Sequence, residues 1–579
     1  MKNIKKLNIL ITPFIIFLVV LVASCDLDED PRDRVSGEQV FQDEAFADAL
    51  AADLYARFPY VAFDNFNGKL GEHDLGTSRG GNFQGCFTHG GMTNNKDCEG
   101  LWDYEYMRDM NVYIENLRAS ELSDGFKNRL EGEVRTLRAA VYFKMQKRYG
   151  GVPIIDVVLD PFEEVPEQYR VRSTETAVAD FIDSELAASA VLLMANGDDP
   201  SQTGRVNQYT ALAYKARANL FAASIAQFGT LAANELTGIA ASRADEFYGK
   251  ASAAAQAVIA GPYTLLSGGD PVQTYRNIFI EDSNSEIIFE RIYNGVEIGH
   301  SFAHQNQPTP FSEGQGSEMN PTLGLVNQYE NLDGTFSTPA FGTGTLYATG
   351  RAPWENKDPR LHASVFFEGD NYAGNIVELY EGIDNGSEII SEVGVSVSGK
   401  SSVGTASRRQ ANQFFPSTGF LLHKYIPPTP FIPAGTESNN WKELRLAEMY
   451  LIAAESEFEL GNLTDAATWL NFTRNRVGLI DLDETTITRD RVRTERTSEL
   501  IYEGHRWYDI RRWRTAFDLL NGQVVQGLRV IYDDASGQYY FLQIDGESVQ
   551  RQFRQEHYYN PITQSRIEAQ GELVENPNY

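Results

Sequence analysis

Apolar side chains recur at helical spacing in several long stretches of this chain, and the pattern predicts a mainly helical protein. The predicted helices cover residues 39–58, 101–117, 126–149, 174–194, 207–228, 241–259, 442–460 and 464–476. Thr174 is expected to cap the fourth helix, while Pro59 and Pro153 stop the first and the third.

The last two of these helices are joined by Gly461-Asn462, and this segment resembles a tetratricopeptide hairpin. A hairpin of this kind buries its apolar face only against neighbouring hairpins, so several must stack. About four helix pairs can be counted along the chain. The pattern therefore predicts a tetratricopeptide-like helical scaffold.

Three other regions are rich in glycine, proline, serine and aromatic residues rather than in helical repeats. They cover residues 60–100, 266–440 and 520–579. Short runs at 286–292 and 365–367 have the composition of strands. Long irregular loops in folded proteins are usually functional or disordered, so we expect the ligand-binding surface in these three regions.

The segment 495–514 carries the densest pattern of aromatic and charged residues. As one helix it would place Leu500, Gly504, Trp507 and Arg511 on one face, and Gly504 would allow a neighbour to approach closely. Glu503 with Arg506, and Asp509 with Arg512, stand three residues apart and would form ion pairs. A clamped structural helix is favoured over a catalytic one.

The string Glu499-Leu500-Ile501-Tyr502-Glu503-Gly504-His505-Arg506-Trp507-Tyr508-Asp509-Ile510-Arg511-Arg512-Trp513 resembles the C-terminal signature of the SusD/RagB family, the surface nutrient-binding lipoproteins of Bacteroidetes. A second match runs from Leu137 to Pro153, and the ending Asn576-Pro577-Asn578-Tyr579 is also similar. The resemblance implies one domain over 39–579. Its right-handed helical scaffold of four pairs would occupy 39–59, 101–265 and 441–519.

Composition supports a folded core and excludes one class of partner. Hydrophobic residues make up 42% of the chain and aromatic residues 12%. The formal net charge of −30 argues against nucleic acid.

The first 24 residues have the pattern of an export signal, with lysines followed by an apolar run too short for a comfortable membrane span. Val22-Ala23-Ser24-Cys25 resembles a bacterial lipobox, which implies lipidation of Cys25, an acyl anchor in the membrane and a tether over 25–38. The acidic residues at 26–30 resemble a signal for the outer face of the outer membrane. An ordinary solvated tether explains them equally well.

Cys86 and Cys98 are the remaining cysteines, and export permits a disulfide between them. Two separate buried thiols are the alternative. If formed, the short loop would contribute ~3 kcal/mol to stability.

Two motifs match catalytic patterns without the required context. Residues 394–401 fit the phosphate-loop pattern, but no strand precedes them and no helix follows. Residues 76–80 spell a nucleophile elbow after the polar run 72–74, so a flexible loop is the favoured interpretation. No cofactor is predicted, and no motif indicates a transition metal. Calcium stays open because oxygen ligands are abundant.

A sugar site needs aromatic rings for the CH-rich face of the sugar and polar groups for its hydroxyls. The loop 60–100 offers His73, Asp74, Arg79, Asn82, Phe83 and Phe87, and we expect Trp354, Arg360 and Tyr372 to form an opposite wall. For each aromatic residue, ordinary packing is the competing interpretation. Trp354 is the best single candidate.

The resemblance implies a non-enzymatic, lipid-anchored receptor that binds a glycan and delivers it to a TonB-dependent transporter of the SusC type. A secreted glycoside hydrolase is the enzymatic alternative, because the chain has 80 acidic residues from which a catalytic pair might come. A tetratricopeptide-type scaffold that binds only proteins is the third.

Overall fold

The structure, a computed structural model, describes residues 41–61, 63, 71–78, 85–195, 201–282, 284–410 and 415–579. The predicted export signal, Cys25 and the tether lie outside these ranges. None of the helices within them has the length and apolarity needed to cross a membrane. The same ranges hold no cluster of side chains suited to a metal ion.

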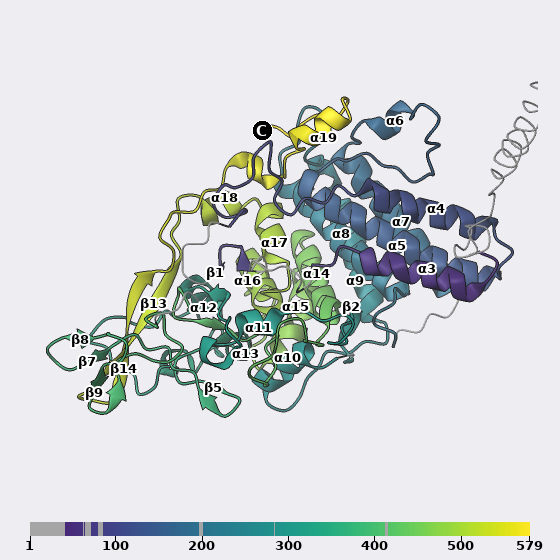
Figure 1. Ribbon diagram of the computed structural model, residues 1–579. Coiled ribbons are helices and arrows are strands. Elements are labelled where there is room, and N and C mark those ends of the chain that lie inside the picture. Colours follow the sequence, from purple (N-terminus) through teal and green to yellow (C-terminus); the bar gives the residue numbers. More distant parts are fainter. Residues whose placement is uncertain are drawn as a thin grey trace, which may run out of the picture.

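Long helices occupy one side of the molecule and short strands the other (Figure 1). The long helices are α3 (Glu44–Arg57), α4 (Tyr104–Ala119), α5 (Asp124–Tyr149), α7 (Glu175–Met194), α8 (Gln208–Phe228), α9 (Ala244–Ile259), α14 (Leu446–Glu459), α15 (Leu463–Arg476) and α16 (Arg489–Leu500). From α5 onward each packs against the next through α7, α8, α9, α14 and α15. This is the predicted mainly helical, tetratricopeptide-like architecture.

The helix stack continues across the long insertion in the sequence. Helix α9 packs directly against α14, although residues 260–445 separate them. Ala213 and Ala216 on α8, and Ala251 and Ala255 on α9, are fully buried. Their small side chains let the two helix backbones approach closely, while larger residues such as Leu137 fill the remaining space.

The capping residues explain where two of the helices begin. The Thr174 side chain accepts a hydrogen bond from the Ala177 N–H (3.1 Å), which confirms the predicted cap. Asn207 accepts one from the Thr210 N–H (2.9 Å) in the same way at the start of α8.

Short helices and strands make up the rest of the chain. The helices are α6 (Glu167–Arg170), α10 (Pro271–Ile280), α11 (Phe302–Asn306), α12 (Leu323–Gln328), α13 (Pro359–Ser364), α17 (Arg506–Arg512), α18 (Ala516–Leu520) and α19 (Gln564–Ala569), with single 3-10 turns η2 (Ala241–Arg243), η3 (Thr309–Phe311), η4 (Ala352–Trp354) and η5 (Gln555–Tyr558). The strands are β1 (Gly76–Ser78), β2 (Ile287–Arg291), β3 (Met319–Pro321), β4 (Val365–Phe366), β5 (Asn371–Tyr372), β6 (Asn375–Ile376), β7 (Ile383–Asp384), β8 (Ile389–Ile390), β9 (Ser396–Val397), β10 (Lys400–Ser401), β11 (Leu421–Leu422), β12 (Trp441–Arg445), β13 (Gln526–Asp533) and β14 (Gln538–Asp545).

The strands surround a second hydrophobic core. The one four-stranded sheet within the described ranges has the order β14-β13-β7-β8. The hairpin β13–β14, with Val530 opposite Phe541, forms one side of this sheet, and β7 joins parallel to β13. Residues from both the insertion and the C-terminal region, including Trp354, Phe367 and Leu528, fill this core. The insertion and residues 520–579 therefore fold together.

The predicted helix over 442–460 begins too early. Residues 441–445 form β12, which pairs antiparallel with β2, and α14 starts only at Leu446. All five residues of β12 are buried, and its charged side chains are satisfied by ion pairs such as Lys442 with Glu290 (2.8 Å). A strand buried on both faces has no alternation of polar and apolar residues, so the sequence pattern did not reveal it.

The prediction of one helix over 495–514 is wrong. Helix α16 ends at Leu500, and α17 begins at Arg506 after a turn in which Tyr502 (φ 62°) and Gly504 (φ 77°) adopt left-handed conformations. The proposed apolar stripe across this segment therefore does not exist. A Cβ atom on Gly504 would lie 2.6 Å from Val61 Cγ1, so the predicted close approach is confirmed.

Glu503 does not pair with Arg506 as predicted, because the turn points it into a buried charge network. Arg445 donates from Nε to Glu503 (2.6 Å) and from Nη1 to Glu286 (2.8 Å) and Glu499 (2.6 Å). Glu499 also accepts from Arg476, and Glu503 from Lys424 (2.7 Å). This buried charge network joins the helices to the insertion. Its members are Arg360, Lys424, Arg445 and Arg476 with Glu286, Asp358, Glu495, Glu499 and Glu503.

The two catalytic look-alike motifs have structural roles. Residues 396–401 form the hairpin β9–β10, whose turn holds Ser398 and Gly399 at positive φ. No helix begins in the described residues 402–410 that follow, so a helix N-terminus does not direct backbone amides at a phosphate here. Gly76–Ser78 is strand β1, which pairs with β3, while the rest of the elbow motif lies outside the described residues.

Candidate functional site

The residues predicted for the first wall of a sugar site hold the structure together where they are described. His73 is 3% exposed, and its Nδ1 accepts the Leu75 N–H (3.1 Å). Asp74 accepts from Arg506 Nε (2.8 Å). Burial alone would raise the pKa of Asp74, but Arg506 lowers it below its usual value. Arg79, Asn82 and Phe83 lie outside the described residues.

The three residues predicted for the opposite wall are buried. Trp354 is 1% exposed, with its ring stacked on Phe367 at 4.9 Å between centroids. Arg360 is fully buried between Asp358, Glu495 and Glu499 in the charge network. Tyr372 bonds through its hydroxyl to the Thr429 carbonyl (2.9 Å). These side chains offer no free surface, so the structure gives them packing and ion-pair roles instead of ligand contacts.

Of the two alternatives left open for Cys86 and Cys98, the structure has the disulfide. Cys86 and Cys98 are bonded with 5.9 Å between their Cα atoms. The enclosed loop packs through Phe87 on Trp507 of α17, with 4.6 Å between ring centroids. Phe87, proposed for the sugar site, is therefore a core residue of a third cluster that links this loop to α17 and α18.

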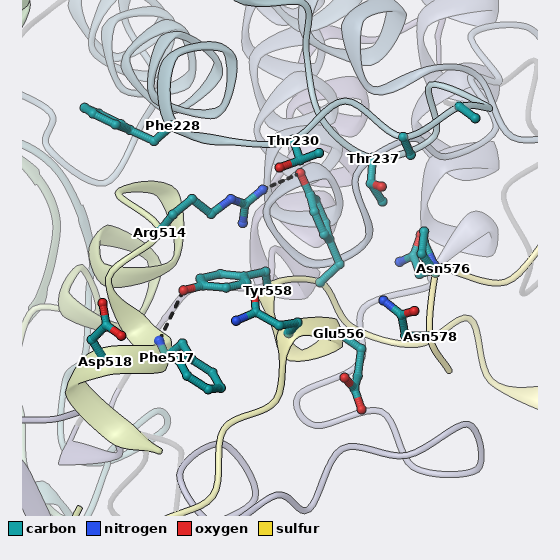
Figure 2. A pocket seen from close by; sticks show the side chains of 15 residues that line it. Phe228, Thr230, Thr237, Arg514, Phe517, Asp518, Glu556, Tyr558, Asn576 and Asn578 are labelled. Carbon is teal, nitrogen blue, oxygen red and sulfur yellow. Dashed lines mark hydrogen bonds between the residues drawn. The ribbon is translucent and has the colours of Figure 1, made fainter. Parts of the chain in front are cut away.

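A cavity of about 560 Å³ opens where the end of α8, the segment after α17 and the C-terminal segment meet (Figure 2). This volume falls in the range of small-molecule sites. The cavity is lined by Phe228, Thr230, Ala232, Ala233, Thr237, Arg514, Phe517, Asp518, Gln555, Glu556, Tyr558, Tyr559, Asn576, Pro577 and Asn578. It combines aromatic rings with hydroxyl, amide and charged groups, which is the mixture expected for a saccharide.

Helix α17 fixes one wall of the cavity. Arg512 donates to both carboxylate oxygens of Glu455 (2.5 and 2.6 Å) and to Asp509 (2.9 Å), as the sequence predicted for the latter pair. Trp513 Nε1 also donates to Glu455 (2.7 Å). Arg514 follows directly with φ 57°, so this left-handed residue leaves the helix at a fixed angle and lines the cavity.

The C-terminal segment forms the opposite wall. Arg511 donates to the Tyr558 carbonyl (3.1 Å) and to Asn560 (3.2 Å), which attaches this segment to α17. The Asn576 side chain is held by Arg172 (2.8 Å) and donates to the Asn560 carbonyl (2.8 Å). The tail is therefore anchored through Asn576, and Asn578, another lining residue, is exposed.

The polar groups that line the cavity differ in how many hydrogen bonds they already form within the protein. Tyr559 donates to Glu175 Oε2 (2.7 Å) and accepts from Arg514 Nη2 (3.0 Å) and the Gly238 N–H (3.1 Å). Tyr558 accepts from the Phe517 N–H (3.1 Å). Figure 2 shows the Arg514 guanidinium between Thr230 and the Tyr558 ring.

The sequence pattern predicted part of the binding surface in 520–579 but did not mark Arg514, Tyr558 or Asn578 as binding residues. The cavity draws on four segments that are far apart in the chain, so no local spacing marks it. The available signals were the adjacent tyrosines at 558–559 and the family-like ending at 576–579.

Comparison with known proteins gives a family and a fold. A model of the SusD family matches residues 285–579. A comparison with curated proteins finds no match. Among solved structures, a SusD-like protein from Bacteroides fragilis is 24% identical with a TM-score of 0.73, over 93% of this chain and 98% of that one.

Two further structures have the same fold. A SusD-like carbohydrate binding protein from Bacteroides fragilis is 20% identical with a TM-score of 0.68, over 92% of this chain and 99% of that one. Surface glycan-binding protein A from Bacteroides uniformis is 19% identical with a TM-score of 0.61, over the same shares of the two chains.

Proposed function

Because the chain belongs to the SusD family, we propose that it is a lipid-anchored glycan receptor on the outer face of the outer membrane. It captures an oligosaccharide and passes it to a TonB-dependent transporter of the SusC type. The anchor is the acylated Cys25. Such a receptor performs no chemistry, and its affinity is moderate because very slow release would stall import.

The observation that carries the ligand part of this proposal is the make-up of the cavity. Phe228 and Phe517 are partly exposed and supply apolar faces, and Tyr558, which is 9% exposed, adds the part of its ring that reaches the cavity. Thr230 and Asn578 supply hydrogen-bonding groups. Two solved proteins with this fold are a carbohydrate binding protein and a surface glycan-binding protein. A saccharide ring packed on Tyr558 would bury apolar CH groups and leave its hydroxyls near the polar rim.

Titration of the purified protein against a panel of polysaccharides and oligosaccharides tests the ligand. We expect at least one member to bind, and Tyr558→Ala to weaken that binding by ~10-fold or more, since about 1.4 kcal/mol of contact would be lost. Phe162→Ala is the matched control, because Phe162 is 95% exposed and lies outside the cavity. An equal loss in both variants would contradict binding in the cavity.

The delivery role needs its own test. Affinity purification from outer membranes of the native organism should retrieve a TonB-dependent transporter with the protein. Retrieval of other proteins alone, with no saccharide binding, would favour the scaffold that binds only proteins.

A glycoside hydrolase is the second candidate, because two carboxylates line the cavity. Asp518 is exposed, and Glu556 is paired with Arg554. Burial alone would raise the pKa of Glu556, but its own backbone N–H and Arg554 lower it. A general acid needs a raised pKa, so this pair is poorly suited to protonating a leaving group. Release of reducing ends that stops in Glu556→Gln would establish the hydrolase.

A further inference from the structure

Arg514 differs from the arginines of the buried charge network in the partners that hold it. Its Nη2 donates to the Tyr559 hydroxyl (3.0 Å) and its Nη1 to the Arg511 carbonyl (3.3 Å). Within the described part of the chain, no carboxylate forms an ion pair with it at 4 Å or less. Both partners are neutral, so the positive charge is still available to a ligand.

The guanidinium is held in a fixed position inside the cavity. It lies 4.7 Å from the Tyr558 ring centroid and 5.1 Å from that of Tyr559. A planar guanidinium matches the two oxygens of a carboxylate, and a fixed one loses little conformational entropy on binding. Tyr559 acts as a positioning residue, because its hydroxyl donates to Glu175 and can therefore only accept from Arg514.

The acidic groups near the cavity do not neutralise the positive charge of Arg514 where a ligand would contact it. Glu556 is paired with Arg554. Glu175 lies fully buried behind Tyr559, and burial raises its pKa. Asp518 is exposed at the rim. Arg514 is thus the one cationic side chain among the cavity-lining residues.

We propose that the cavity takes an acidic sugar residue, whose carboxylate pairs with Arg514 while its ring packs on Phe517 and on the accessible edge of Tyr558. Hydroxyls of the sugar bond Thr230 and Asn578 at the edge. This inference rests on the proposed glycan-binding function and narrows it to saccharides that carry a carboxylate, such as uronic acids.

The charge of the whole protein limits how acidic that saccharide is. A formal net charge of −30 repels a polyanion that comes within about 8 Å of the surface, the distance beyond which physiological salt screens the charges. One carboxylate inside the cavity contacts Arg514 directly. The ligand is therefore a mostly neutral chain with isolated acidic residues rather than a densely charged polymer.

Matched pairs of oligosaccharides test this inference. Each pair consists of an oligosaccharide with a single uronate on a neutral chain and the same molecule after reduction of its carboxylate to an alcohol. We expect at least one acidic member to bind about tenfold or more tightly than its reduced counterpart, as charge-assisted hydrogen bonds do. In Arg514→Gln the two members of that pair should bind within about twofold of each other.

Two further variants control the measurement. Arg514→Lys keeps the charge but not the planar fork, so most of the preference should be lost. Arg57→Gln removes an exposed arginine that lies outside the cavity and should keep the preference. Near-ultraviolet circular dichroism and the melting temperature of each variant should match the parent protein.

The outcomes separate this inference from the proposed function. Equal binding of acidic and reduced members overturns the inference and leaves glycan binding intact. A preference that survives in Arg514→Gln overturns the role of Arg514. Binding of no saccharide at all overturns both proposals.

Discussion

Arg445 lies in the buried charge network, whereas Arg514 lines the cavity, and the two guanidiniums differ in what neutralises them. Arg445 contacts three glutamates and is 1% exposed. Arg514 contacts a phenol and a carbonyl. An arginine whose charge is neutralised by several buried carboxylates has a structural role, whereas an arginine held by neutral groups can still form an ion pair with a ligand.

The largest expected effect comes from breaking the charge network. Arg445→Met leaves Glu499 and Glu503 without a major buried partner, which should lower the free energy of unfolding by about 3–5 kcal/mol. Urea denaturation measures this. Arg57→Gln removes an exposed ion pair with Asp109 and should cost about 1 kcal/mol or less. Equal stability of the two variants would contradict the architectural role of Arg445.

The next largest effect is expected at Trp354, which was predicted to bind a sugar but is buried in the second hydrophobic core. Trp354→Ala should lower the free energy of unfolding by about 3–5 kcal/mol through the space it leaves beside Phe367 and Phe541. Differential scanning calorimetry would detect this, with Phe162→Ala as an exposed control. A variant that folds normally but loses glycan affinity would restore the sequence-based prediction.

The buried carboxylates predict acid sensitivity. Burial alone would raise the pKa of Glu443, but Lys144 and Arg217 lower it from 4.5 to about 2. A lowered pKa contributes stability above the unfolded value and loses it as pH falls through the folded one. The free energy of unfolding should thus drop between pH ~4.5 and ~2, by an amount on the order of 3 kcal/mol from this group. In Glu443→Gln this part of the pH dependence should disappear.

The smallest expected effect lies in the cavity. Tyr558→Phe removes the hydroxyl that accepts the Phe517 N–H and should cost about 1 kcal/mol of unfolding free energy. The ring remains, so saccharide affinity should change by less than about threefold, in contrast to Tyr558→Ala. Calorimetric titration of both variants compares the two effects. A large loss of affinity in Tyr558→Phe would show that the hydroxyl, not the ring, contacts the ligand.

The helical scaffold was predictable because its signals are local. Thr174 caps α7 as expected, and apolar periodicity located each long helix up to α9. Prediction failed where tertiary contacts override local preference. Tyr502 adopts a left-handed conformation in the turn between α16 and α17, where its ring is buried in the second hydrophobic core and lies 5.6 Å from the His73 ring, a tertiary contact that no local propensity encodes.

The candidate site was less predictable than the scaffold. Trp354 and Arg360 have the residue types of a sugar site, but residue type alone does not distinguish a ring on the surface from one in the core. Arg514 is the opposite case, because the sequence did not distinguish this cavity residue from structural arginines. It follows directly after a signature whose arginines are structural, and only its partners in three dimensions distinguish it from them.

The direct packing of α9 on α14 has a consequence for how the chain acquires its structure. The apolar face of α9 is complete once residue 259 has been made, but its cover begins only at residue 446. At ~5–20 residues per second, synthesis of the intervening segment takes on the order of ten to forty seconds. During that interval the apolar face of α9 is exposed in the incomplete helix stack. We therefore expect chaperones that hold unfolded chains to bind it until α14 packs against α9.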